Sequence, residues 1–188
     1  MLNNKWVLSV HALYEYRLEE ALRLIKSLLD SCAIEDYSPP QLPFYLANRS
    51  ILHWTLGETD DALRYAVAAV SEAPNLAILR FVYGCIAFEM GFWQRAWVEF
   101  AQCVDLFPSG PGQDKDRIDC EEGEWGLEYV LRKEQVRENM EKAHAKCVFD
   151  DGTLVGIWRV PGLRMFEPRG SDGELIGRSF GGAVDFSL

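Results

Sequence analysis

The sequence contains no Cys-x-x-Cys pair, which is a spacing typical of structural zinc sites. Its five cysteines are scattered and odd in number: Cys32, Cys85, Cys103, Cys120 and Cys147. Neither a disulfide framework nor a metal site is therefore expected. A reduced, cytoplasmic setting is the simplest interpretation.

Long apolar runs are also missing. No stretch approaches the roughly 20 apolar residues that a membrane-spanning helix requires. The first apolar stretch is broken by His11 and Glu15 and has no small-residue cleavage site, so no signal peptide is predicted. We expect no insertion into a membrane.

Basic residues are outnumbered, with 19 Lys and Arg against 29 Asp and Glu, and the formal net charge is -10. Nucleic-acid binding needs clustered Lys and Arg to contact phosphates, so this class of function is disfavoured. The acidic balance permits a basic protein partner.

Catalytic motifs are absent as well. The sequence has no GxSxG, no P-loop and no GxGxxG after a predicted strand. Its three histidines (His11, His53 and His144) fall in predicted helices, and no Cys or carboxylate recurs with them at metal-ligand spacing. We predict no catalytic residue, metal or cofactor, and an enzyme with an unrecognised site is kept only as a third hypothesis.

What the sequence does contain is a repeat. Four residues in one segment are each matched 34 residues later: Gly57, Ala62, Ala69 and Pro74 by Gly91, Ala96, Cys103 and Pro108. Each glycine comes where a first helix must stop, because glycine tolerates the left-handed conformation that often ends a helix. The small residues allow two helices to approach closely, and each proline ends the second helix. This pattern is that of the tetratricopeptide repeat (TPR), an antiparallel helical hairpin of about 34 residues.

A weaker copy precedes these two repeats. Apolar residues recur at helical spacing over residues 6–14 and 18–29, and Ala21 takes the small-residue position. The segment that follows holds Pro39, Pro40 and Pro43 and is predicted to be a longer connection. We therefore predict repeats near residues 2–35, 43–76 and 77–110.

The remaining chain divides into three parts. A loop rich in Gly, Pro and Asp is predicted over residues 108–123, and a helix over 124–147 is expected to cap the last repeat. Residues 148–188 are Gly-rich and are predicted to form an extended arm. The expected fold is all-α: a TPR domain over residues 1–147, built as a helical-hairpin solenoid of about three repeats plus the capping helix, with the extended C-terminal arm after it.

From Pro43 onward the chain also resembles a particular TPR family. Four segments carry the resemblance: LAILRFVYG (76–84), IDCEEGEWGLEYVLRKEQVREN (118–139), VPGLRMFEP (160–168) and ELIGRSFGGAV (174–184). They are similar, in the same order, to segments of the cytosolic activators of superoxide-producing NADPH oxidases, which include neutrophil cytosolic factor two and fungal NoxR. One predicted helix stands here where that family has a fourth helix pair.

This resemblance implies a binding role. The family binds a GTP-loaded Rac-type small GTPase through the loop after the third repeat. Asp119, with Ile118 before it, matches the family's Asp toward the GTPase. The family's Arg and Asn in that loop have no counterparts, since residues 108–110 are Pro, Ser and Gly, and Arg117 is the candidate substitute.

The resemblance further implies an activation segment that acts on the oxidase flavocytochrome as a second partner. Ile176, Gly177 and Arg178 match it. Gly181 and Gly182 stand where the family has two valines, and loss of bulky apolar side chains would weaken docking. The matching residues therefore imply that the chain stimulates superoxide production, whereas the two glycines argue against it.

The alternative is a general TPR adaptor that binds a partner peptide in its concave groove. The first helices of repeats two and three supply the candidate groove residues: Phe44, Ala47, Ile51, Trp54, Ile78, Phe81, Cys85 and Phe88. Recognition of a C-terminal carboxylate, as in co-chaperone TPR domains, is disfavoured, because Asn48 alone occupies one of the five polar positions needed.

Overall fold

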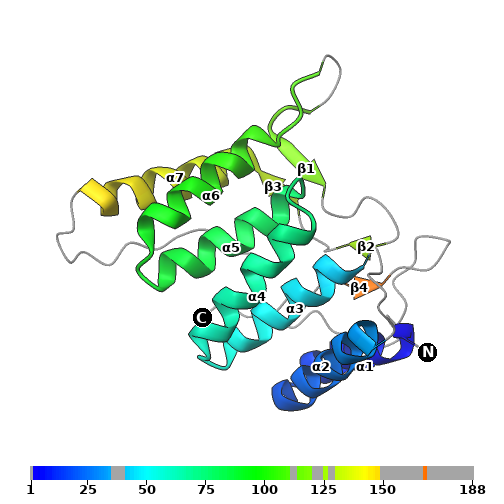
Figure 1. The fold of residues 1–188 in the computed structure, drawn as a ribbon. Coiled ribbons are helices and arrows are strands. Elements are labelled where there is room, and N and C mark those ends of the chain that lie inside the picture. The colour runs from blue at the N-terminus through cyan, green and yellow to red at the C-terminus, as the bar shows by residue number, and fades with distance from the viewer. Residues whose placement is uncertain are drawn as a thin grey trace.

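The structure, a computed structural model, describes residues 2–34, 41–110, 114–119, 125–126, 130–148 and 167–168. These residues form seven helices: α1 (Leu2–Tyr14), α2 (Leu18–Ile34), α3 (Leu42–Thr55), α4 (Thr59–Glu72), α5 (Ala77–Glu89), α6 (Trp93–Asp105) and α7 (Lys133–Val148). Consecutive helices pair as hairpins, α1 with α2, α3 with α4 and α5 with α6, and the hairpins stack in a row with α7 against α6 (Figure 1). The predicted all-α helical-repeat fold is confirmed.

The three hairpins close with the same backbone turn. Gly57 and Gly91 have φ values of 77° and 79°, in the left-handed region predicted for them. The residue after each glycine donates its N–H to a carbonyl five residues earlier, Glu58 to His53 and Phe92 to Ala87, both at 2.9 Å. This is the Schellman motif that commonly ends helices.

The first hairpin has this turn without a glycine. Tyr16 takes the left-handed position with φ 58°, and the next residue, Arg17, donates its N–H to the carbonyl of Ala12 at 2.8 Å. A side chain is disfavoured in this conformation because its Cβ approaches the backbone. The first hairpin therefore ends its first helix with the same turn as the other two. The repeat is harder to recognise in the sequence because tyrosine replaces glycine at this position.

We expect Tyr16→Gly to raise the free energy of unfolding by about 0.5–1 kcal/mol, because glycine adopts a positive φ without steric strain. The measurement is urea unfolding followed by far-UV circular dichroism. Tyr16→Ala is the matched control, since it removes the ring but keeps the Cβ. A gain of equal size in both variants would assign the effect to the ring and contradict the backbone argument.

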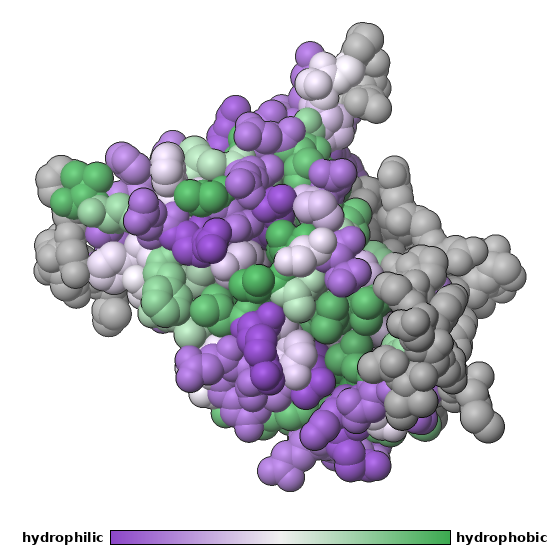
Figure 2. All heavy atoms as spheres, viewed as in Figure 1, coloured by the Kyte–Doolittle hydropathy of each residue, from purple (hydrophilic) through white to green (hydrophobic). Residues whose placement is uncertain are grey.

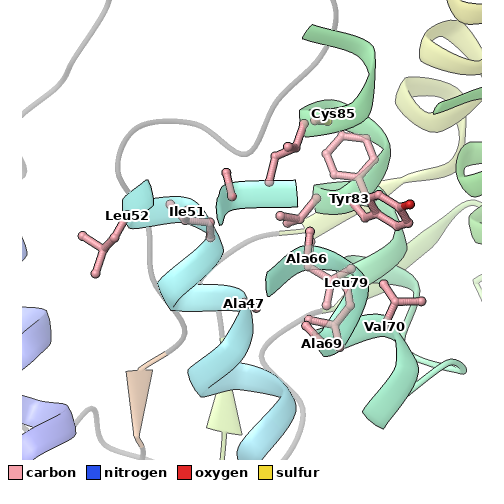
Figure 3. Packing of buried hydrophobic residues seen from close by; sticks show 14 of the residues in the cluster. Ala47, Ile51, Leu52, Ala66, Ala69, Val70, Leu79, Tyr83 and Cys85 are labelled. Carbon is pink, nitrogen blue, oxygen red and sulfur yellow. The ribbon is translucent and has the colours of Figure 1, made fainter. Parts of the chain in front are cut away.

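The small residues of the repeat pattern lie where the helices meet. Ala62, Ala96 and Ala21 are fully buried, as is Cys103. The hydrophobic core continues between hairpins, where Ala66, Ala69 and Val70 of α4 lie beside Leu79 and Tyr83 of α5 (Figure 3). Trp6 of α1 meets Tyr45 of α3 edge-on, with ring centroids 4.6 Å apart, and so ties the first hairpin to the second.

Four short strands follow the third hairpin. β1 (Arg117–Asp119) pairs antiparallel with β3 (Val130–Arg132), and β2 (Trp125–Gly126) pairs antiparallel with β4 (Glu167–Pro168). The β4 strand lies against α1, so this part of the predicted arm reaches the first hairpin (Figure 1). The rest of the arm after α7, residues 149–166 and 169–188 with Ile176, Gly177 and Arg178, lies outside the described residues.

The capping helix differs from its prediction. It begins at Lys133, because Val130–Arg132 is extended and pairs with β1, with Ile118 opposite Leu131. The Leu131 side chain is fully buried in this position. The N–H of Lys133 donates to the carbonyl of Asp116 at 2.8 Å and fixes where α7 begins. The predicted helix start at residue 124 is therefore wrong, and the prediction misassigned strand residues as helical ones.

Candidate protein-binding surfaces

The first candidate surface is the strand β1, which holds the three predicted GTPase contacts. The guanidinium of Arg117 is exposed, and its Nε lies 4.0 Å from Oδ2 of Asp114. The side chain of Ile118 is half-buried and packs on the hydrophobic core. Asp119 pairs with Val130 through the strand, and its side chain lies outside the described part of the chain. The structure thus holds the three residues on one short hairpin beside the start of α7.

The second candidate surface is the predicted groove on α3 and α5, and several of the predicted groove residues are buried. Phe81 is fully buried and contacts Phe100 of α6 inside its own hairpin, with ring centroids 5.9 Å apart. It is a core residue because α5 packs against α3, α4 and α6 and leaves almost no exposed face. Ile51 and Phe88 are also buried, whereas Phe44 and Trp54 are partly exposed.

Trp54 is the groove residue with the clearest polar contact. Its indole Nε1 donates to Oε2 of Glu89 at 3.0 Å, which joins the end of α3 to the end of α5. Asn48, the polar residue considered for carboxylate recognition, is fully buried in α3. A peptide carboxylate cannot reach its amide, which agrees with the expectation that this type of recognition is disfavoured.

A cluster around His53 closes the turn between α3 and α4. His53 is buried, and its Nδ1 lies 2.5 Å from Oε2 of Glu58. Its imidazole stacks on the ring of Tyr65, with centroids 5.3 Å apart, and the guanidinium of Arg49 lies 4.0 Å from the centre of that ring. The ligand atoms of His53, Glu58 and Asp61 lie within 4.8 Å of one another, a spacing that could suit a metal ion.

The hydrogen bonds of this cluster do not fit a metal. Arg49 donates its Nε–H to Nε2 of His53 at 3.3 Å, so Nε2 is an acceptor and Nδ1 carries the proton that Glu58 accepts. A metal on Nδ1 would move this proton to Nε2, where a ligating histidine needs an acceptor and meets an arginine N–H instead. Asp61 is already paired with Arg64 at 2.6 Å. The cluster is explained by closure of the turn.

A third candidate surface lies where the first turn of α6 meets the last turn of α7. It is an open hollow of about 690 Å³, and the residues that line it are Gly91, Phe92, Trp93, Gln94, Arg95, Trp97, His144 and Cys147. Phe92 is 50% exposed and Trp97 is 38% exposed. These aromatics are not among the predicted site residues. Their signal in the sequence is three aromatic side chains within the six residues 92–97.

The comparisons with known proteins concern the fold. No protein-family model matches the chain, and no curated protein sequence matches it. The solved Sgt2 TPR domain from Aspergillus fumigatus is similar, with a TM-score of 0.55 and 14% identity over 86% of this chain and 91% of that one. The chain has the TPR fold. PcrH from Pseudomonas aeruginosa is also similar, with a TM-score of 0.56 and 14% identity over 77% of this chain and 92% of that one.

At such low identity these likenesses extend to the TPR architecture and no further. Stacked helical hairpins of this kind form extended surfaces that are suited to binding other proteins. Within the described part of the chain, no helix is both long enough and apolar enough to cross a membrane.

Proposed function

We propose that this TPR domain is a non-catalytic scaffold that binds a GTP-loaded Rac-type small GTPase through β1 and the residues before it. The proposal rests on the segment Ile118–Asp119, which resembles the GTPase-binding segment of the NADPH oxidase activators. The observation that best supports it is the place of this segment in the fold. It comes after the third hairpin, beyond residues 106–116, and is held by pairing with β3, with the Arg117 guanidinium exposed.

Pairing of β1 with β3 favours binding because it fixes the backbone before the partner arrives. A preordered segment loses less conformational entropy on association than a flexible loop does. Arg117 is the basic residue of β1, and its exposed guanidinium carries several N–H donors with the geometry to bind a carboxylate of the partner.

The test is binding of the purified chain to Rac loaded with a GTP analogue and, separately, with GDP, measured by isothermal titration calorimetry. We expect binding to the GTP form only, and a loss of affinity of about tenfold for Arg117→Ala and for Asp119→Ala, the size of one lost charge-assisted contact. Arg23→Ala on α2 is the matched control, since it also removes an exposed arginine but lies in the first hairpin. Absence of binding to both forms would rule out the GTPase role.

Stimulation of an oxidase flavocytochrome belongs to the same proposal as a second step. It would depend on Ile176, Gly177 and Arg178, and a superoxide assay with the oxidase flavocytochrome tests it. A chain that binds the GTPase and yields no superoxide would be a binding module without the activating step.

The second candidate function is a general adaptor that binds a peptide beside Trp54. The partly exposed indole at the junction of α3 and α5 favours it, because a tryptophan that is hydrogen-bonded through its Nε1 can still offer an apolar ring face. The two functions separate by mutation: Trp54→Ala should abolish peptide binding and leave the affinity for the GTPase unchanged.

A further inference from the structure

The hollow between α6 and α7 has a chemistry that differs from the rest of this acidic protein. No carboxylate is among the described residues that line it, whereas the chain as a whole carries a net charge of -10. Arg95 and His144 line it together with the aromatic side chains of Phe92, Trp93 and Trp97. The surface therefore combines aromatic side chains with the positive charge of Arg95.

The positive charge is available to a partner. The Arg95 side chain is 58% exposed, and its Nη1 lies 3.7 Å from Oε1 of Glu99. Glu99 has a closer partner in Arg80, whose Nη1 lies 2.9 Å from Oε2, so Arg95 is the less strongly held of the two arginines. His144 is exposed and lies beside Trp97, with ring centroids 5.7 Å apart.

A cationic partner is disfavoured at this place. Aromatic rings can attract cations, but the Trp93 ring already has the ammonium group of Lys146 5.6 Å from its centre. A second cation would meet the exposed guanidinium of Arg95, and no carboxylate is among the described lining residues to offset the repulsion. An acidic partner would instead be attracted by the exposed charge of Arg95.

We infer that this hollow is a second docking site, which takes a peptide segment with an aromatic or leucine anchor flanked by Asp or Glu. The anchor would pack among Phe92, Trp93 and Trp97, as aromatic side chains commonly do at the centre of interfaces. The flanking carboxylates would accept hydrogen bonds from Arg95 and His144.

This site is separate from the proposed GTPase surface. The hollow lies at the beginning of α6, and β1 follows the end of that helix. The helix Trp93–Asp105 rises about 1.5 Å per residue, which separates its two ends by about 18 Å. Figure 1 shows the α5–α6 turn and the end of α7 on one side of the molecule and β1 on the other. On the face drawn in Figure 2, hydrophobic residues are interspersed with hydrophilic ones.

The test begins with a random peptide library displayed on phage, selected against the full chain and counter-selected against Phe92→Ser. Phe92 is the N-cap residue of α6 and makes no side-chain cap hydrogen bond. Serine is a preferred N-cap residue, so this variant should fold while losing one wall of the hollow. Leu76→Ser is the matched control, because Leu76 is a partly exposed apolar N-cap of α5 that also lacks a cap hydrogen bond.

We expect the enriched peptides to combine an aromatic or leucine residue with Asp or Glu. Synthetic versions of them, measured by fluorescence anisotropy, should bind Phe92→Ser and His144→Glu at least tenfold more weakly than wild type, with Leu76→Ser unchanged. The inference would be overturned by enriched peptides that are basic or neutral, or by equal binding to Phe92→Ser. It would also be overturned by a selection that enriches no peptide dependent on Phe92. Arg117→Ala should leave peptide binding intact, so this result and the GTPase test can fail independently.

Discussion

Replacing Glu99 with alanine is expected to lower the free energy of unfolding by about 3 kcal/mol, because it leaves a largely buried arginine without its counter-charge. Glu99 is 4% exposed in α6 and pairs with Arg80 of α5 at 2.9 Å. Arg80 would keep its hydrogen bonds to Gln102 and to the carbonyl of Pro74, the latter at 2.7 Å, which places the cost at the lower end of that known for broken buried pairs. Urea unfolding followed by far-UV circular dichroism measures the change.

A double variant separates the pair from the loss of packing. Arg80→Met with Glu99→Leu removes both charges and fills similar volume, and it should recover most of the lost stability, since such replacements of buried pairs are often neutral. Glu20→Ala is the control, because Glu20 pairs with Arg17 on the exposed surface, where an ion pair contributes little. A Glu99→Ala variant as stable as the Glu20→Ala variant would contradict the argument.

The charge of Glu99 also acts on the hydroxyl group of Tyr83 in α5. Burial raises the pKa of the Tyr83 hydroxyl, and the charge of Glu99 raises it further, while Arg95 lowers it. Removing Glu99 should therefore lower the pKa of Tyr83, while burial continues to raise it. In sequence, Glu99 is one more carboxylate on an amphipathic helix, and helical spacing alone assigns such a residue to solvent. Its burial depends on Arg80, 19 residues earlier, which only the packing of α5 on α6 reveals.

The repeats could be predicted because their key residues act through the backbone. Gly57 and Gly91 are needed because the backbone has a positive φ there, and Ala62 and Ala96 are needed because two helices approach closely. The residue types at these positions therefore indicate the structure directly. The first repeat was harder to recognise because Tyr16 occupies the glycine position. The start of α7 could not be predicted, since pairing of β3 with β1 is a contact between distant segments and helical spacing does not detect it.

The candidate sites were predictable to a smaller extent. Phe81 has the spacing of a groove residue. Because α5 is packed on several sides, however, apolar residues occur all around it, and their spacing does not distinguish core residues from groove residues. Arg117 and Ile118 lie in a strand, whereas the sequence pattern predicted a loop over residues 108–123. The hollow at Phe92 joins the ends of α6 and α7, which lie about 50 residues apart in sequence, so only the tertiary fold brings its parts together.

Gly84→Ala is expected to destabilise the third hairpin by about 1–2 kcal/mol, although alanine is the better helix former by about 1 kcal/mol. Gly84 lies within α5, and a Cβ at this position would come within 2.6 Å of Cε1 and 2.8 Å of Cδ1 of Phe100. Such contacts are far shorter than normal van der Waals separation. The Phe100 ring cannot move aside easily, because it is fully buried and lies against Phe81. The clash therefore outweighs the gain in helix propensity.

A double-mutant cycle with Phe100→Leu tests this explanation. Phe100→Leu alone should destabilise the protein, because it leaves a cavity in the core. In the Gly84→Ala background the smaller leucine makes room for the new methyl group, so the double variant should be more stable than the sum of the two single effects predicts, by about 1 kcal/mol or more. Strict additivity would show that the methyl group and the ring do not compete for the same space. It would then assign the requirement for glycine at residue 84 to a cause other than the approach of α6.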